Sequence, residues 1–156
     1  MAIARSLKDF MKKHHVAYNV IPHPRTLSSM QTAAAAHVPG DRLAKSVVLE
    51  DEDGYMVAVL PSTHRLDLGK LHHQFSRKLG LATENELREL FKDCELGAIP
   101  PVGAAYGFDT IIDDSLTDQP DIYFEAGDHE ELVHVSGEQF KQLMTGSRYG
   151  HFSHHV

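Results

Sequence analysis

The sequence predicts an α+β fold in which helices flank a mixed, curled β-sheet. Segments with helical spacing of apolar residues alternate along the chain with short apolar segments typical of strands. The clearest pair of strands is joined by a short acidic turn at residues 51–54, so these two strands form a hairpin. Hairpins between strands favour a mixed sheet over a doubly wound parallel one.

The first half of the chain predicts two helices, a strand and the hairpin. Ile3, Leu7 and Phe10 recur at helical spacing. Ser28 or Ser29 is a suitable N-cap for the second helix, because a hydroxyl oxygen can accept from the free amides of the first turn. The expected elements are a helix over about 3–14, a strand over 17–21, a helix over 31–36 and hairpin strands over 45–50 and 55–60.

The second half predicts three helices and three strands around a loop rich in Gly and Pro. Asp67 is a suitable N-cap, and Thr83 and Ser136 each begin a sequence with capping-box spacing. The expected elements are helices over 67–79, 83–91 and 136–143, a structured loop over 96–107, and strands over 108–112, 122–125 and 132–135. Together they give one domain over residues 1–146. The polar, His-rich tail, 147–156, is expected to be loose.

Length and composition exclude several classes of protein. A chain of 156 residues with 42% hydrophobic and 24% charged residues fits one soluble globular domain. No apolar run approaches the roughly 20 residues that span a bilayer, and the first residues lack the core of a signal peptide. Cys94 is the only cysteine, so no intramolecular disulfide can form. These features predict a cytoplasmic protein without a membrane partner.

Charge is distributed unevenly along the chain. The net charge of −7 argues against a general nucleic-acid binder, and no DNA partner is expected. Residues 1–92 hold 13 Lys and Arg against 10 Asp and Glu, whereas residues 93–140 hold 12 Asp and Glu and no basic residue. Contacts to phosphate are therefore expected from the first part of the chain. The acidic stretch could equally serve only to keep the protein soluble.

Three features are candidates for a functional site. Lys45 begins an apolar strand, where its ammonium group could project into a cleft and hold a phosphate or a carbonyl oxygen. The loop 97–103 begins with Gly97 and is stiffened by two prolines, so the amides of Ala98 and Ile99 could be directed at an ester carbonyl. His129 lies in a turn between two strands and could orient a water molecule. A surface lysine, a plain connecting loop and a solvated histidine are the alternatives.

Other chemistries find less support in the sequence. Within each of the adjacent pairs His14-His15 and His72-His73, the two histidines cannot bind the same ion well from a regular element. No paired cysteines or HExxH helix accompany them. No metal and no cofactor are therefore expected. Cys94 fits a packed small side chain better than a nucleophile. The absence of GxGxxG, Walker and GxSxG motifs leaves nucleotide-dependent and serine-hydrolase chemistry unsupported.

The order of these features resembles the YbaK/prolyl-tRNA synthetase-associated domain family. The resemblance covers about residues 1–145. It includes an Ala-rich early helix, the strand Lys45-Ser46-Val47-Val48-Leu49 with its acidic turn, the loop Gly97-Ala98-Ile99-Pro100-Pro101-Val102-Gly103, the turn Phe124-Glu125-Ala126-Gly127-Asp128-His129 and a final capped helix.

The resemblance implies a partly barrel-like sheet and hydrolysis of the ester that joins a wrong amino acid to tRNA, without a cofactor. It implies catalytic roles for Lys45, Gly97 and His129, with Lys45 anchoring the 3′ end of the substrate. The substrate-binding residues that it implies are Ser46, Ala98, Ile99, Pro100, Pro101 and Asp128. Much of the chemistry is assigned to the substrate, through the neighbouring ribose hydroxyl. The tRNA would be a mischarged tRNA(Pro) or a related tRNA, with an aminoacyl-tRNA synthetase as a further candidate partner.

Several points stay open at the level of sequence. Ser46 stands where alanine-selective members tend to have Asn, so the amino acid is Ala, Cys, Ser or another small one. Lys12, Lys13, Arg65 and Lys70 are candidates for contacts to the tRNA backbone. A module that binds tRNA or a synthetase without catalysis and a small-molecule ester hydrolase are the alternative functions. In the leading interpretation, the Lys45 ammonium and the amides of the Gly97 loop face each other across one cavity.

Overall fold

The computed structural model describes residues 3–26 and 28–156. Residues 1, 2 and 27, which the expected domain 1–146 includes, lie outside the described residues. The elements are α1 (Arg5–Lys13), β1 (Asn19–Pro22), α2 (Ser29–Ala35), β2 (Leu43–Asp51), β3 (Gly54–Pro61), β4 (His64–Leu66), α3 (Leu68–Phe75), β5 (Gly80–Leu81), α4 (Glu84–Leu90), β6 (Asp109–Asp113), β7 (Asp121–Glu125), β8 (Glu131–Ser136), α5 (Gly137–Leu143), β9 (Arg148–Gly150) and β10 (Ser153–His155), with short 3₁₀ helices at Gly40–Arg42, Gly103–Tyr106 and Asp114–Leu116.

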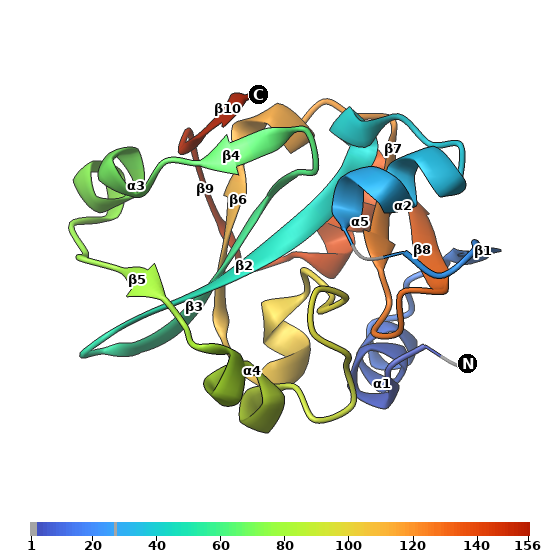
Figure 1. Cartoon of the computed structure of the whole chain (residues 1–156), viewed down its shortest axis with the longest axis horizontal. Coiled ribbons are helices and arrows are strands. Elements are labelled where there is room, and N and C mark those ends of the chain that lie inside the picture. The colour runs from blue at the N-terminus through green and yellow to red at the C-terminus, as the bar shows by residue number, and fades with distance from the viewer. Residues whose placement is uncertain (1–2, 27) are drawn as a thin grey trace.

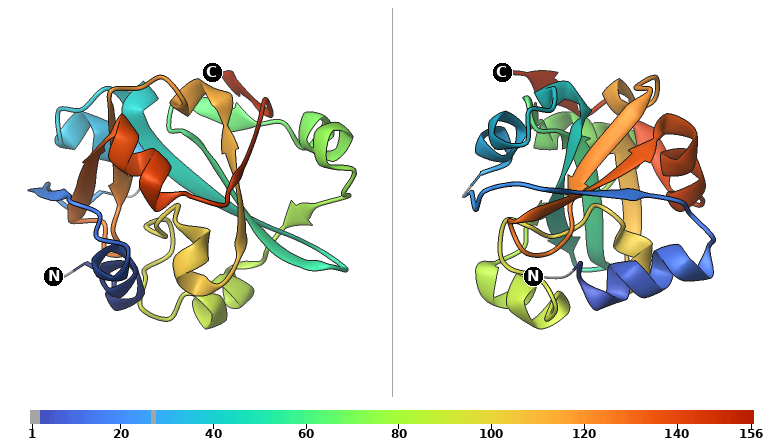
Figure 2. Two further views of the ribbon diagram at one scale, coloured as in Figure 1. Left: turned by 180° about the vertical axis from the view of Figure 1, so that it is seen from behind. Right: turned by 90° about the vertical axis from the view of Figure 1, so that its right-hand side faces the viewer.

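In the described part of the chain, eight strands form one mixed sheet. The order is β1-β8-β7-β2-β3-β6-β9, with β5 added beside β2. The β2–β3 hairpin and the β7–β8 pair are antiparallel, whereas β2 pairs with β7, and β3 with β6, in parallel. Helices α2 and α5 lie on opposite sides of this strongly twisted sheet (Figures 1 and 2). The predicted α+β class with a mixed sheet is confirmed.

Local sequence signals account for the helix starts. Ser28, Asp67, Thr83 and Ser136 are the N-caps, and each side chain accepts from an amide of the first turn. Thr83 and Ser136 form complete capping boxes, as their spacing predicted. None of the described helices is both long and apolar enough to cross a membrane.

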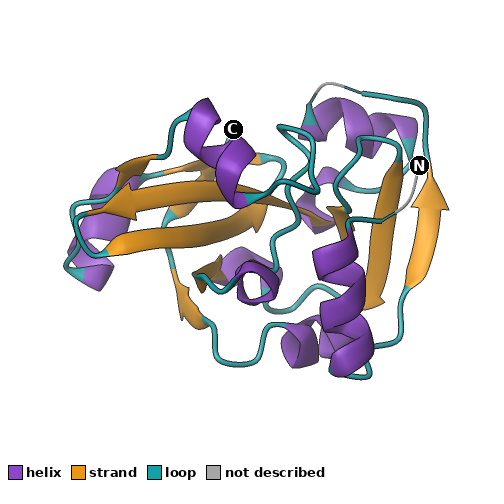
Figure 3. Cartoon of the chain, turned by 90° about the horizontal axis from the view of Figure 1, so that it is seen from below, coloured by secondary structure: helices purple, strands orange, loops and turns teal. Residues whose placement is uncertain are grey.

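The C-terminal tail differs from the expectation. It is not loose, because β9 extends the main sheet beside β6 and β10 pairs with β4. Phe152, between these two strands, is fully buried and packs against residues of β2, β3, α3 and β6. Through this one aromatic residue the polar segment becomes part of a hydrophobic cluster with β2, β3, α3 and β6, which the polarity of the tail did not indicate. Figure 3, the view from below, shows helices on both sides of the strands.

One edge of β2 is paired only at its two ends. Leu43 and Ala44 pair with β7, and Leu49 and Glu50 pair with β5. Residues 45–48 lie between these two short contacts, while the other edge of β2 pairs with β3 along its whole length. This interruption leaves room beside the middle of β2, opposite the loop that follows α4.

Candidate functional site

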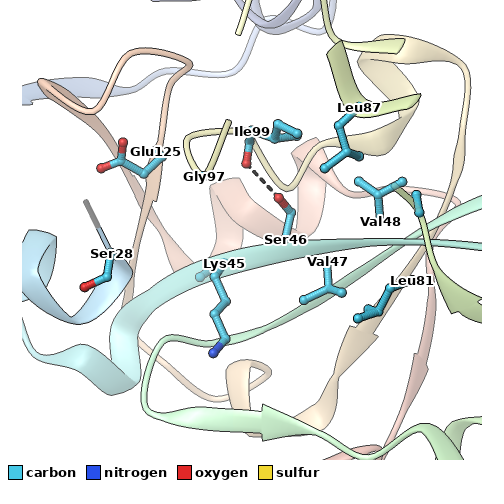
Figure 4. A pocket seen from close by; sticks show the side chains of 12 residues that line it. Ser28, Lys45, Ser46, Val47, Val48, Leu81, Leu87, Gly97, Ile99 and Glu125 are labelled. Atoms are coloured by element: carbon cyan, nitrogen blue, oxygen red, sulfur yellow. Dashed lines mark hydrogen bonds between the residues drawn. The ribbon is translucent and has the colours of Figure 1, made fainter. Parts of the chain in front are cut away.

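A cavity of about 360 Å³ lies at the interruption beside β2. Its two ends differ in polarity. Glu125 and Ser28 lie at one end, and Val48, Leu81 and Leu87 lie at the other, with the Gly97 loop between them (Figure 4). The full lining consists of Ser28, Ala44, Lys45, Ser46, Val47, Val48, Leu81, Ala82, Leu87, Gly97, Ile99 and Glu125.

Ser46 connects the strand to the loop across this cavity. Its hydroxyl donates to the carbonyl oxygen of Ile99 at 2.7 Å. The Val48 carbonyl accepts from Ala82 N at 3.0 Å, on the open edge of β2. Because the direction of main-chain groups repeats every two residues in a strand, the amide and carbonyl of Ser46 also face that edge. The side chain of Ser46 therefore holds the loop to the strand, while its main-chain amide and carbonyl are directed at the cavity.

The shape of the loop depends on Gly97 and His129. Gly97 has φ +82°, a conformation that favours glycine, and a Cβ atom there would lie 3.1 Å from His129 Cε1. His129 is buried and also has positive φ, at +60°. Its Nε2 donates to the carbonyl oxygen of Leu96 at 2.6 Å. His129 thus packs against the loop and holds it by a hydrogen bond, and the absence of a side chain at residue 97 permits the close contact.

The amides of the loop are only partly available. Ala98 N donates to the carbonyl oxygen of Glu95 at 3.1 Å, so the expectation of a free amide at Ala98 is wrong. The amides of Gly97 and Ile99 have no acceptor among the described residues. Gly97 is exposed and both residues line the cavity. Two such donors can stabilise negative charge that develops on a carbonyl oxygen.

The Lys45 ammonium does not face the loop. Successive side chains of a strand point to opposite faces, so Ser46 points to the loop and Lys45 points away from it (Figure 4). Lys45 Nζ donates to the carbonyl oxygen of His64 at 2.6 Å. The expected arrangement of ammonium and amides across one cavity is therefore wrong in this respect.

Lys45 belongs to two cavities at once. It also lines a neighbouring cavity of about 330 Å³, together with His64, Arg65 and His155. Burial lowers the pKa of Lys45, and the positive charge of Arg65 adds to this effect. The half-buried ammonium and Arg65 make this second cavity suited to an anionic group.

Sequence reasoning missed Glu125 and His23. Glu125 ends β7, and its side chain is only 7% exposed. His23 Nε2 lies 3.2 Å from Glu125 Oε1, and His129 Nδ1 lies 3.9 Å from Glu125 Oε2. Burial raises the pKa of Glu125, although both histidines oppose the shift. The available signal was an acidic residue closing an apolar strand, which is too common to single out.

The other predicted substrate-binding residues lie behind the cavity wall. Pro100 and Pro101 are buried and, like Ala98, do not line the cavity. Asp128 is buried, and its Oδ1 accepts from the amides of Glu130 and Glu131. These residues hold the loop and the turn in place, so direct contact with a substrate remains a prediction for them.

The four candidate tRNA-binding residues are exposed but form two separate groups. Lys12 and Lys13 end α1, whereas Arg65 and Lys70 lie on β4 and α3 at the opposite end of the molecule (Figure 1). Arg65 also lines the second cavity beside Lys45.

One group of side chains has the spacing of metal ligands within the described ranges, namely Asp113, Asp114 and His151. Asp113 already accepts from the amides of Ser115 and Phe152. Its carboxylate therefore has a structural role, in holding the C-terminal segment to β6.

The chain is similar to known proteins in both sequence and fold. The family described as "Aminoacyl-tRNA editing domain" matches residues 23–143. No curated protein matches the chain. A solved structure of "a putative trans-editing enzyme for prolyl tRNA synthetase" is 25% identical, with a TM-score of 0.82, over 97% of this chain and 96% of that one.

Two further solved structures share the fold. A structure of "hypothetical protein APE2540" is 20% identical, with a TM-score of 0.84, over 96% of this chain and 100% of the other. A structure from work on epitope grafting onto scaffold proteins is 19% identical, also with a TM-score of 0.84, over 98% and 97% of the two chains.

Proposed function

Because this chain belongs to the aminoacyl-tRNA editing domain family, we propose that it is a trans-acting deacylase, which hydrolyses the ester between a small, wrongly attached amino acid and tRNA. The solved relative described as acting for prolyl tRNA synthetase supports tRNA(Pro) or a related tRNA as the carrier. A synthetase would then be a candidate partner. An enzyme with this substrate would work in the cytoplasm, where translation takes place.

The observation that carries this proposal is the cavity beside the interrupted edge of β2, with Gly97 and Ile99, two residues whose amides have no acceptor in the described part of the chain, on its wall. The amides of Gly97 and Ile99 would donate to the ester carbonyl oxygen as water attacks the carbonyl carbon. The bond to the ribose oxygen then breaks, and that oxygen takes up the proton that the attacking water loses. Holding ester and water together in a small cavity supplies much of the rate enhancement without a dedicated protein base.

Lys45 would act from the second cavity. Its ammonium, beside Arg65, is suited to a phosphate of the 3′ end of the tRNA. Since Lys45 also lines the first cavity, a phosphate held in the second cavity would lie next to an ester held by the loop. Lys45 is thus proposed to anchor the substrate and not to polarise the ester carbonyl.

The apolar end of the first cavity supports a small amino acid. Val48, Leu81 and Leu87 exclude water there without offering hydrogen bonds. Such a pocket discriminates by size, and one methylene group changes binding by about 1–3 kcal/mol. Ala and Cys therefore fit the proposal better than large or strongly polar residues.

The proposal is tested by a deacylation panel with Ala, Cys, Ser and Pro on tRNA(Pro). We expect turnover of at least one small, non-cognate aminoacyl-tRNA by the wild type and a strong loss in Lys45→Ala. Lys141→Ala, which removes an exposed lysine outside both cavities and outside the candidate tRNA-binding groups, is the matched control. Binding of tRNA without any turnover would identify a non-catalytic module of the same fold. Equal turnover of free aminoacyl esters and charged tRNA would identify a small-molecule hydrolase.

A further inference from the structure

The polar end of the first cavity contains a buried carboxylate with unfilled acceptor positions. Glu125 lines the cavity, its side chain is only 7% exposed, and neither carboxylate oxygen accepts a hydrogen bond within the described part of the chain. A buried carboxylate without donors is costly, so such groups are normally paired. The rings of His23 and His129 lie beside these oxygens without donating a hydrogen bond to them, which leaves room for a ligand that supplies donors or positive charge.

Two histidines flank this carboxylate in fixed orientations. His23 Nδ1 lies 2.8 Å from the Pro24 carbonyl oxygen, and His129 Nε2 lies 2.6 Å from the Leu96 carbonyl oxygen. A carbonyl oxygen can only accept, so each of these nitrogens carries a proton. The other nitrogen of each ring, which is His23 Nε2 or His129 Nδ1, faces Glu125. In the neutral ring this nitrogen has only a lone pair to offer.

The hydroxyl groups nearby do not fill the gap. Thr32 Oγ1 donates to the Ser28 carbonyl oxygen at 3.0 Å, and Thr26 Oγ1 lies 2.5 Å from Thr32 Oγ1. The Thr32 hydroxyl lies near enough to Glu125 to lower the pKa of the carboxylate, but its one proton is directed to Ser28, so the contact between the threonines uses the proton of Thr26. Two lone pairs and a carboxylate facing one another are stable only with a proton or a cation between them.

We propose that Glu125 binds the α-ammonium group of the esterified amino acid. In an aminoacyl ester the carboxyl group is used in the bond, so the ammonium is the one charge that every small amino acid keeps. Its three donors match the unfilled oxygens of Glu125. With the ammonium at this end, the ester lies near Gly97 and Ile99, and the side chain points to the apolar end of the cavity.

This inference rests on the proposed function, but a binding measurement tests it without turnover. The probes are adenosine carrying alanine through a 3′-amide in place of the ester, the same compound N-acetylated, and the lactyl analogue with a hydroxyl in place of the ammonium. Affinities are measured for the wild type, for Glu125→Gln and for Glu130→Gln. Glu130 lies in the same turn but does not line the cavity, which makes it the matched control.

We expect the wild type to bind the ammonium form about tenfold to hundredfold more tightly than either other probe, as charge-assisted hydrogen bonds imply. Glu125→Gln should lose this preference and bind the acetylated probe as the wild type does, while Glu130→Gln keeps it. The lactyl comparison needs only the wild type, and Glu125→Asp, which keeps the charge, should retain part of the preference if Glu125→Gln does not fold.

The ammonium site and the deacylase function can each be overturned without the other. A wild type without preference for the ammonium, or a Glu125→Gln variant that weakens all probes equally, overturns the ammonium site even if charged tRNA is hydrolysed. Preference for the ammonium in a protein that hydrolyses no aminoacyl-tRNA supports the site and overturns the deacylase.

Discussion

The absence of a side chain at Gly97 permits the loop conformation that shapes the candidate site. The residue has φ +82°, and its α-carbon faces the His129 ring so closely that a Cβ atom would lie 3.1 Å from Cε1. His129 in turn donates to the carbonyl oxygen of the preceding residue, Leu96. Backbone conformation and side-chain contact therefore constrain the same peptide, whose amide is a proposed donor to the substrate.

Gly97→Ala should raise the activation free energy of deacylation, measured through kcat, by more than it lowers the free energy of unfolding. The positive φ costs about 1 kcal/mol for a residue with a Cβ atom, and the contact with His129 displaces the loop amides in addition. Gly107→Ala is the matched control, because Gly107 has φ +80° and open space around the added atom. Thermal unfolding and steady-state kinetics of both variants check this. Equal activity of the two variants would contradict the role of the His129 contact.

Ser46→Ala should release the loop from β2. The variant leaves the Ile99 carbonyl oxygen without its 2.7 Å hydrogen bond, which costs about 1 kcal/mol of stability. We expect kcat to fall by about tenfold or more, because the amide of Ile99 moves with its carbonyl. This is a larger effect than the loss of stability. Ser147→Ala, which changes a serine that lines neither cavity, should leave kcat unchanged. A Ser46→Ala enzyme with wild-type kcat would exclude the tether from the mechanism.

At the scale of elements, an ion pair joins the tip of the β2–β3 hairpin to the segment after α3. Arg77 Nε and Nη2 donate to the two carboxylate oxygens of Asp51 at 2.8 and 2.7 Å. This pairing holds the pKa of Asp51 at about 2, below its ordinary value of 3.8. The same segment continues into β5, which closes one end of the candidate site.

The stabilising effect of this pair should depend on pH. Because the folded pKa lies below the unfolded one, the contribution of Asp51 is complete above about pH 4 and is lost as the pH falls towards 2. Asp51→Asn should therefore lower Tm at pH 7, and its difference from the wild type should shrink at pH 2 to 3. Asp53→Asn, an exposed residue of the same turn, is the control. A constant difference in Tm across this range would contradict the ion pair.

At the scale of the whole molecule, the C-terminal segment completes both a core and a cavity. Phe152 is fully buried beside Leu71 and Ile111, and its ring meets Phe75 edge to face at 6.4 Å. The next residue begins β10, which pairs with β4 and brings His155 to the cavity that Lys45 also lines. The last residues thus contribute to the surface that is proposed to hold a phosphate.

Phe152→Ala should lower the free energy of unfolding by about 3–5 kcal/mol, since a large side chain is removed from a filled core. Tyr149→Ala changes an aromatic residue of the same segment that is 44% exposed, and should cost much less. Denaturant unfolding of both variants measures the difference. Similar losses in the two variants would mean that the segment is not packed as described.

The two basic groups should differ in their effect on tRNA binding. Arg65 and Lys70 lie on the side of the second cavity, whereas Lys12 and Lys13 lie at the opposite end of the molecule (Figure 1). Replacing Arg65 and Lys70 by Ala should reduce the slope of the logarithm of the binding constant against the logarithm of salt concentration. The reduction should correspond to the loss of about two phosphate contacts. The double variant of Lys12 and Lys13 should change it less. The reverse order would place the tRNA along α1.

The sequence by itself determined the α+β class, the helix starts at Asp67, Thr83 and Ser136, and the family resemblance, which the comparison with known proteins confirmed. These depend on contacts between near neighbours in the chain and on the order of motifs. The tertiary structure alone decided that Lys45 turns away from the Gly97 loop and that Glu125, which lines the cavity, lies beside His23. Strand alternation requires Lys45 and Ser46 to point to opposite faces, but only the pairing between distant segments decides which face meets the Gly97 loop and which residues meet Glu125.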